Sequence, residues 1–163
     1  IFWTRELGTS PEQGSFALTV FFSIGIFMTY IGGLLGDKFG PIKIIRLSLL
    51  VWLPAMFLLT EVPNFSPLIM MPVAYLLLLM IGAAKAISYS PVIVLGQTYL
   101  AKSIGFASGI TLGVSQTIGG VIAPVVGNLA DTYSLPVAMM TLVPFLIGGL
   151  GASLLLKDPK KLQ

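Results

Sequence analysis

One basic residue, Lys85, lies inside a long apolar run, where a charge is costly. Placing a lysine at the middle of a bilayer costs about 2.5–3.5 kcal/mol, so such residues usually face a cavity or a partner. Ser88 and Tyr89 follow three and four residues later and therefore share its helical face. The three side chains form a polar patch with one positive charge. A patch of this kind is suited to binding an anionic group.

Two interpretations of Lys85 remain open. In the first, Lys85 lines a substrate path and attracts the anionic part of a small molecule. In the second, it is structural, and it either pairs with a carboxylate from outside this chain or extends toward the membrane surface, where its charge stays hydrated. A substitution of Lys85 that left function intact would exclude the first interpretation.

The sequence offers no catalytic constellation. It contains no Cys and no His, which removes thiol chemistry, disulfides and the usual zinc ligand sets. No acid/base pair and no nucleophile–base pair is clustered either. We therefore expect no enzyme, no metal and no cofactor. Since no Asp or Glu falls deep within an apolar run, any proton carrier must lie outside this chain.

The elements that position these residues are membrane-spanning helices. Of the 163 residues, 56% are hydrophobic and 9% are charged, whereas soluble domains usually hold about 45–50% and 25%. Crossing a hydrocarbon core of about 30 Å takes roughly 20 apolar residues in a helix. The sequence therefore predicts an all-α integral membrane protein, in contact with the lipid bilayer, with five complete spans over residues 15–36, 42–60, 67–95, 104–129 and 136–156.

Residues 1–5 are typical of the interfacial end of a helix whose body lies upstream, because Trp3 belongs to a residue type that favours the headgroup zone. We expect them to be the tail of a sixth helix. The first complete span begins with a clear start signal, since Ser10 suits the N-cap and Pro11 suits the first helical position.

The basic residues decide the expected orientation. If successive loops alternate sides, one side holds only Arg5 and the other holds Lys38, Lys43, Arg46, Lys102, Lys157, Lys160 and Lys161. Cytoplasmic loops are enriched in Lys and Arg, so we expect the second side and the C-terminus in the cytoplasm of a multi-pass cell-membrane protein. The net charge of +3 is then a matter of topology, and we expect no nucleic acid partner.

The turn between the first two spans is rich in glycine and charge. Its glycines and charged residues are, in order, Gly33, Gly36, Asp37, Lys38, Gly40 and Lys43. The first glycines let a neighbouring backbone approach closely, and Gly40 permits a turn. Asp37 offers a carboxylate to a helix N-terminus or to a basic partner. The alternative is a solvated loop that merely obeys the positive-inside rule.

The pattern Gly-x-Leu-small-Asp occurs twice, at residues 33–37 and 127–131. Matched helix ends are typical of the internal repeats of transporters. They are equally well explained by residues that simply end helices. Both explanations remain open.

The span over 104–129 has a face of small residues. At 100° per residue, one narrow arc contains Gly105, Gly109, Gly113, Gln116, Gly120 and Gly127. Small residues spaced by four are typical of close helix packing in membranes. Gln116 is the polar exception, and it either bonds to a neighbouring helix or contacts the substrate.

The turn resembles the loop motif of the major facilitator superfamily, which reads Gly, three residues, Asp, a basic residue, one residue, Gly and then basic positions. The matching residues are Gly33, Asp37, Lys38, Gly40 and Lys43, while Pro41 and Ile42 occupy positions that are often basic in the family. The resemblance implies that Asp37 latches one conformation through contact with a helix end in another half of the protein.

A second and more specific resemblance covers residues 90–131, which are similar to the C-terminal half of fosmidomycin-resistance-type efflux transporters. That family has twelve helices in two halves, so the five spans would be the eighth to twelfth, and residues 1–5 the end of the seventh. The resemblance implies a drug-resistance antiporter that works by alternating access on an anionic small molecule. A missing N-terminal half would then be its partner.

A free-standing membrane scaffold or assembly protein is the alternative to a transporter. It is favoured if the gene encodes these five spans alone. A membrane-embedded enzyme is a weaker alternative, because no residue cluster supports it.

Overall fold

The computed structural model describes residues 2–156, and the regular elements of this part of the chain are all helical. They are α1 (Phe2–Arg5), α2 (Pro11–Phe39), α3 (Pro41–Glu61), the short η1 (Val62–Asn64), α4 (Pro67–Tyr99), η2 (Ala101–Ser103), α5 (Ile104–Thr132), α6 (Leu135–Met140) and α7 (Val143–Leu155). Five segments here are long and apolar enough to cross a membrane: Pro11–Phe39, Pro41–Asn64, Pro67–Tyr99, Ala101–Thr132 and Leu135–Leu155. The prediction of an all-α membrane protein with five spans is confirmed.

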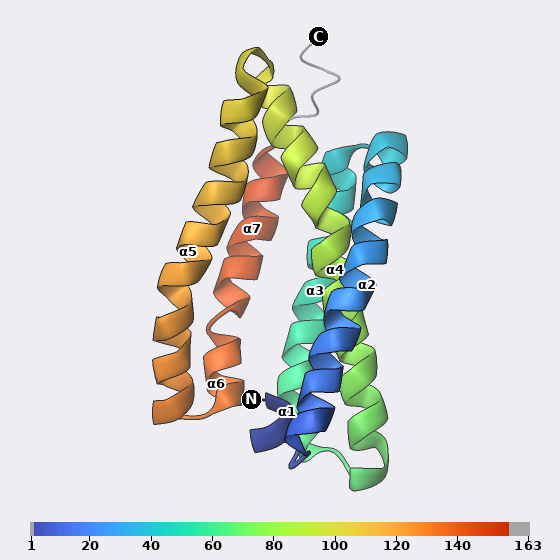
Figure 1. Ribbon diagram of the computed structural model, residues 1–163, viewed down its shortest axis with the longest axis vertical. Coiled ribbons are helices and arrows are strands. Elements are labelled where there is room, and N and C mark those ends of the chain that lie inside the picture. The colour runs from blue at the N-terminus through green and yellow to red at the C-terminus, as the bar shows by residue number, and fades with distance from the viewer. Residues whose placement is uncertain (1, 157–163) are drawn as a thin grey trace.

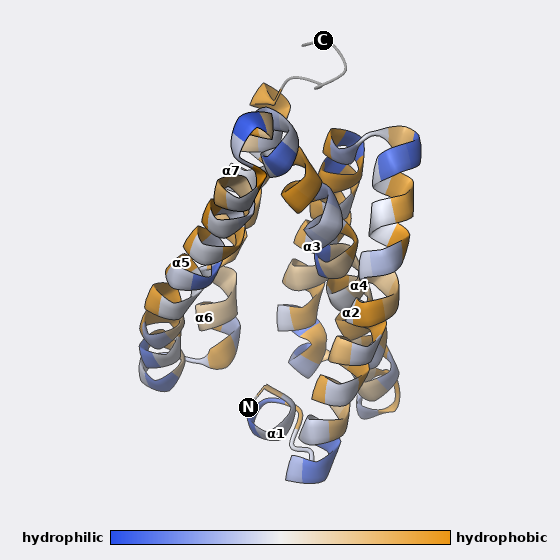
Figure 2. Ribbon diagram, turned by 45° about the horizontal axis from the view of Figure 1, so that its top comes forward, coloured by the Kyte–Doolittle hydropathy of each residue, from blue (hydrophilic) through white to orange (hydrophobic). Residues whose placement is uncertain are grey.

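The long helices stand side by side along the longest axis of the molecule (Figure 1). α2, α3 and α4 pack together as one group, while α7 contacts α3, and α5 contacts both α4 and α6. The α2–α3 and α4–α5 turns lie at one end, and α1 lies at the other end with the α3–α4 and α5–α6 turns. Hydrophobic residues dominate the middle of the helices, and hydrophilic ones lie mostly toward their ends (Figure 2).

The charges expected on opposite sides of the membrane lie at opposite ends of the bundle. Lys38 and Lys43 flank the α2–α3 turn, and Lys102 lies in η2 at the same end. Arg5 and Asp131 belong to the other end. The remaining basic residues of the predicted cytoplasmic side, Lys157, Lys160 and Lys161, lie outside the described residues. Which end faces the cytoplasm stays a prediction.

The ends of α2 follow from local chemistry. Ser10 is its N-cap, as predicted, because the Ser10 hydroxyl accepts a bond from Gln13 N at 3.4 Å and the Gln13 side chain accepts one from Ser10 N at 3.4 Å. The helix ends at Gly40, whose φ of +93° suits glycine. Pro41 then starts α3 with the φ that a helix needs.

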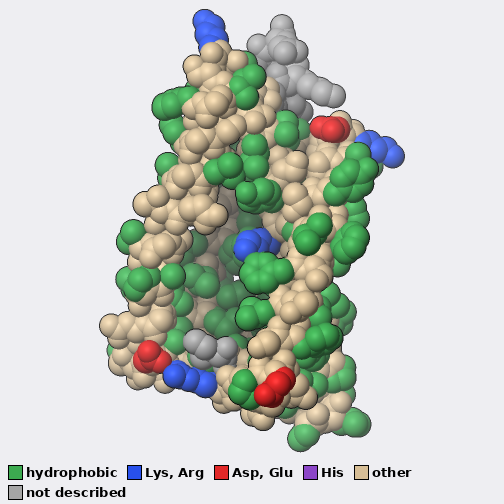
Figure 3. Space-filling model, viewed as in Figure 1, with side chains coloured by type: hydrophobic (Ala, Val, Ile, Leu, Met, Phe, Trp, Pro, Cys, Tyr) green, Lys and Arg blue, Asp and Glu red, His purple; other side chains and the backbone are tan. Residues whose placement is uncertain are grey.

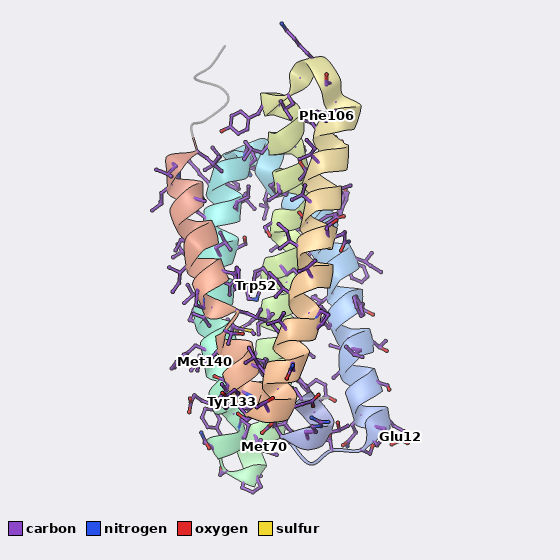
Figure 4. All side chains as sticks on the ribbon, turned by 90° about the vertical axis from the view of Figure 1, so that its left-hand side faces the viewer. Glu12, Trp52, Met70, Phe106, Tyr133 and Met140 are labelled. Carbon is purple, nitrogen blue, oxygen red and sulfur yellow. The ribbon has the colours of Figure 1, made fainter. Side chains whose placement is uncertain are left out.

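The last span differs from its prediction as one helix over 136–156. It divides into α6 and α7, and Met140, labelled in Figure 4, ends α6. The cause is Pro144, which has no N–H to donate and whose ring crowds the carbonyl four residues earlier. Leu142 N bonds instead to Met139 O at 3.0 Å, which tightens the chain at the break.

Helices α2 and α4 approach each other closely at two glycines. A Cβ on Gly32 would clash with the backbone carbonyl of Ile87, and one on Gly36 would come within 3.2 Å of the Pro91 ring. Small residues let two helix backbones come this close in a membrane. Packing, rather than the hydrophobic effect, holds helices together there. The glycines predicted to admit a neighbouring backbone therefore lie against α4 of the same chain.

We predict that Gly32→Ala destabilises the protein by about 3 kcal/mol or more, because the clash is with backbone and no side-chain rotation relieves it. The measurement is the thermal unfolding midpoint of purified protein in detergent, followed by tryptophan fluorescence. Gly151→Ala is the matched control, since nothing lies within 4 Å of its Cβ position. Equal midpoints for the two variants would show that the close α2–α4 contact does not limit stability.

Candidate functional site

Lys85 lies near the middle of α4, and its side chain is exposed within this chain. Its Nζ is 5.5 Å from the centroid of the Phe21 ring on α2, which is within the range of a cation–π contact. In the space-filling view, a basic side chain lies at mid-height in a hollow between α2–α4 on one side and α5–α7 on the other, far from the charges at both ends (Figure 3). The ammonium group of Lys85 therefore lies against an aromatic face at mid-span and stays exposed within this chain.

A groove of about 280 Å³ opens beside Lys85, between α2 and α4. Tyr89 lines it, as the shared helical face predicts. Ser88 is not among the lining residues, and its hydroxyl donates to Lys85 O at 2.9 Å within the helix. Of the predicted patch, Lys85 and Tyr89 come together on the groove. The main additions are apolar residues of α2, namely Phe21, Phe22 and Ile26.

No carboxylate of residues 2–156 is paired with Lys85. Across this part of the chain, the one ion pair joins Arg5 Nη1 and Asp131 Oδ1 at 2.9 Å, at the far end of the bundle. The other acidic residues lie near helix ends, as Glu61 and Asp37 do. Within residues 2–156, the contact that the Lys85 charge makes is therefore with the Phe21 ring and not with a carboxylate.

Gln116 and the small-residue face of α5 point away from the rest of the described chain. Gln116 is exposed. Nothing lies within 4 Å of a Cβ built at any of the predicted packing positions Gly105, Gly109, Gly113 and Gly120. The glycine face of α5 thus packs against no helix within residues 2–156. Its close packing against another helix stays a prediction.

A larger groove of about 670 Å³ separates α5 from α6 and α7. Its lining is almost wholly apolar, and the Arg5–Asp131 pair lies on it. Leu142, at the break between α6 and α7, also lines it. Non-helical backbone is tolerated at membrane depth only where it is buried in protein or lines a cavity, which fits the position of this break.

The glycine-rich turn is tighter than the sequence suggests. Asp37 and Lys38 were expected in a loop, but both belong to the last turn of α2, because the helix continues past its apolar run to Phe39. Lys38 Nζ lies 5.2 Å from the Phe39 ring centroid, and Lys43 is in the first turn of α3.

Asp37 is exposed and bonds to none of residues 2–156. A negative charge at the C-terminal end of a helix opposes the helix dipole. The dipole of α2 therefore does not stabilise the Asp37 carboxylate.

Sequence reasoning missed the contact of Arg46, one turn into α3. Its Nη2 donates to Ser153 O at 2.7 Å and its Nε to the same oxygen at 3.1 Å. The last carbonyls of a helix have no partner within the helix, and a cation there also complements the dipole. Arg46 thus fastens the end of α7 to α3. The sequence alone showed that Arg46 lies near the start of a helix, but it did not show which neighbouring helix the Arg46 side chain would contact.

A second missed contact joins α4 to α5. Gln97 Nε2 donates to Ser108 Oγ at 2.8 Å. One residue earlier, a Cβ on Gly96 would meet the Thr111 hydroxyl. The polar face of α5 that contains Ser108 and Thr111 is therefore turned toward α4, while its glycine face is turned outward.

Comparisons with known proteins agree with this architecture. A family model described as the Major Facilitator Superfamily matches residues 1–163. A protein of Bacillus subtilis (strain 168), described as "Uncharacterized MFS-type transporter YfnC", is 32% identical over 151 residues. The match covers 93% of this chain and 35% of that protein, so the chain spans about a third of the length of this relative. No solved structure matches the chain.

We predict that Arg46→Gln frays the end of α7 and lowers stability by about 1–2 kcal/mol, since it removes charge-assisted bonds to helix carbonyls. Hydrogen exchange of the amides in the last turn of α7 measures the effect directly. Lys43→Gln is the control, because it removes a charge from the same end of α3, and Lys43 makes no hydrogen bond or ion pair within residues 2–156. Unchanged exchange in Arg46→Gln would contradict the role of Arg46 in holding α7.

Proposed function

The chain belongs to the major facilitator superfamily, and from that premise we propose that it forms the C-terminal half of a twelve-helix transporter. It is a multi-pass membrane protein with five candidate spans. These spans correspond to the eighth to twelfth helices, and α1 is the end of the seventh. The coverage of 35% of the relative's length supports a partner half that this chain does not contain.

The proposed activity is efflux of a small anionic molecule by alternating access, with the binding site near mid-membrane between the two halves. The observation that carries it is Lys85, a mid-span cation on an open groove with no carboxylate partner in residues 2–156. The resemblance of residues 90–131 to fosmidomycin-resistance transporters supports a phosphonate drug as one substrate. Tyr89 faces the same groove and is a second substrate contact. We retain Ser88 and Gln116 as contacts made in other conformations or with the partner half.

We further propose that the transporter is an antiporter of the cell membrane, with its C-terminus in the cytoplasm. The positive-inside rule supports this orientation, because Lys38, Lys43 and Lys102 lie at one end of the bundle. Within residues 2–156, no acidic side chain lies deep in a span. If exchange is coupled to protons, the proton carrier therefore belongs to the other half.

Asp37 is proposed to latch one conformation by contact with a basic residue or a helix N-terminus of that half. Its exposure and its unfavourable position at the end of α2 support this role. The adjacent Gly40 turn holds the carboxylate at the edge of the bundle, where the other half can reach it.

We predict that Lys85→Met lowers the efflux rate of the full-length protein by about tenfold or more, because a charge-assisted contact is worth roughly 1.5–3 kcal/mol. The measurement is accumulation of fosmidomycin in cells, with and without an uncoupler of the proton gradient. Lys85→Arg keeps the charge and should retain part of the activity. Lys102→Met, at the bundle end, is the matched control. Full efflux by Lys85→Met would exclude the proposed site, and no efflux by the wild type would favour a scaffold.

We predict that Asp37→Asn slows transport about fivefold, which corresponds to loss of roughly 1 kcal/mol of a helix-end contact, and leaves membrane insertion unchanged. Initial efflux rates are compared at equal amounts of protein in the membrane fraction. Asp131→Asn is the control from the matching pattern at the other end, where an exposed ion pair contributes little. If Asp37→Asn transports at the wild-type rate, the latch is wrong.

A further inference from the structure

We propose that the groove beside Lys85 binds a hydrophobic organic monoanion, with the anionic group on Lys85 Nζ and a flat apolar body against Phe22, Ile26 and Tyr89. In this proposal Phe21 is a positioning residue that holds the ammonium group toward the groove. The inference rests on the proposed function and names the substrate class of that site.

The composition of the groove limits the ligand to one anionic group. Lys85 is the one cation among its lining residues, and the other polar side chains are the hydroxyls of Tyr89 and Thr29. The Thr29 hydroxyl donates to Gly25 O at 2.8 Å, so its proton is already used. The groove thus supplies an ammonium group and one free phenol donor. A singly charged carboxylate, sulfonate or phosphonate group can use both, whereas inorganic phosphate has no apolar part to cover the rest of the groove.

The remainder of the groove is apolar and aromatic. Phe22 and Ile26 are mostly exposed, at 64% and 74%, and Tyr89 is half exposed. These side chains border a space of about 280 Å³, which holds about nine water-sized groups at roughly 30 Å³ each. A small aromatic acid has this size, and its ring would cover the exposed side chains. Burying apolar surface then adds to the attraction between the charges.

Phe21 and Gly82 place the ammonium group. The Phe21 ring lies 5.5 Å below Lys85 Nζ, and it fits there because Gly82 has no side chain. A Cβ on Gly82 would come within 3.1 Å and 3.3 Å of two ring atoms of Phe21. The electron-rich ring face stabilises the cation while the site is empty. An arriving anion binds on the open side of the same ammonium group.

The test measures binding of benzoate to the purified full-length protein in lipid nanodiscs by calorimetry. Benzamide is the neutral probe of the same shape, and inorganic phosphate is the hydrophilic anionic probe. We expect benzoate to bind at least about tenfold more tightly than either one, since one lost charged contact changes affinity by about that factor. Lys85→Met should abolish the preference of the protein for benzoate over benzamide.

The role of Phe21 is tested by substitution with and without the aromatic ring. Phe21→Leu should weaken benzoate binding and reduce its preference over benzamide, while Phe21→Tyr, which keeps the ring, should restore both. Gly82→Ala should resemble Phe21→Leu, because it displaces the ring. Phe27→Leu is the matched control, as Phe27 is an exposed phenylalanine of α2 that does not line the groove.

The outcomes separate this inference from the proposed function. If Lys85→Met stops efflux but phosphate binds as tightly as benzoate, the transporter stands and the hydrophobic-anion class is overturned. If benzoate binds to Lys85→Met as it does to the wild type, the site is not at Lys85. If benzoate binding depends on Lys85 but efflux does not, the binding site stands and the proposed function fails.

Discussion

The contact of Gly32 with the Ile87 carbonyl is the constraint on which the rest of the site depends. It brings two parallel helices together without intervening side chains, and in a membrane such packing replaces the hydrophobic effect as the force between helices. Lys85 lies two residues before Ile87, so the same contact decides which part of α2 faces the lysine. That part is Phe21, for which Gly82 leaves room. The cation, its aromatic support and the groove thus follow from one close approach of two backbones.

Most charged residues lie near the ends of the bundle, because placing a charge in hydrocarbon is costly, and Lys85 is the exception among residues 2–156. The Arg46 guanidinium donates hydrogen bonds to a carbonyl at the end of α7 and so holds that helix against α3. Asp37 and Lys85 have no opposite charge bound to them in residues 2–156. Both are exposed within this chain, one at the bundle end and one at mid-depth.

Membership of the major facilitator superfamily gives these exposed features a common explanation. The outward glycine face of α5, the open groove beside Lys85 and the carboxylate of Asp37 are all surfaces that lack a partner in the described chain. In a transporter of two halves, we propose that the glycine face of α5 packs against the other half. The groove beside Lys85 would bind the substrate, and Asp37 would hold one conformation by contact with the other half. The break at Pro144 adds a bend in the last span, which borders a large apolar groove rather than interrupting the core.

The sequence by itself determined the fold class, the five spans and the separation of charges, because these depend on local hydropathy and on the cost of burying charge. It also indicated the N-cap at Ser10, the turn at Gly40 and the mid-span position of Lys85, which are local properties too. Only the tertiary structure decided that Phe21 supports Lys85, that Gln97 bonds to Ser108, and that Arg46 reaches α7. Those facts depend on which helices become neighbours and how they are rotated. Helical periodicity tells which residues share a face, but the neighbour of that face is set by packing between segments far apart in the chain.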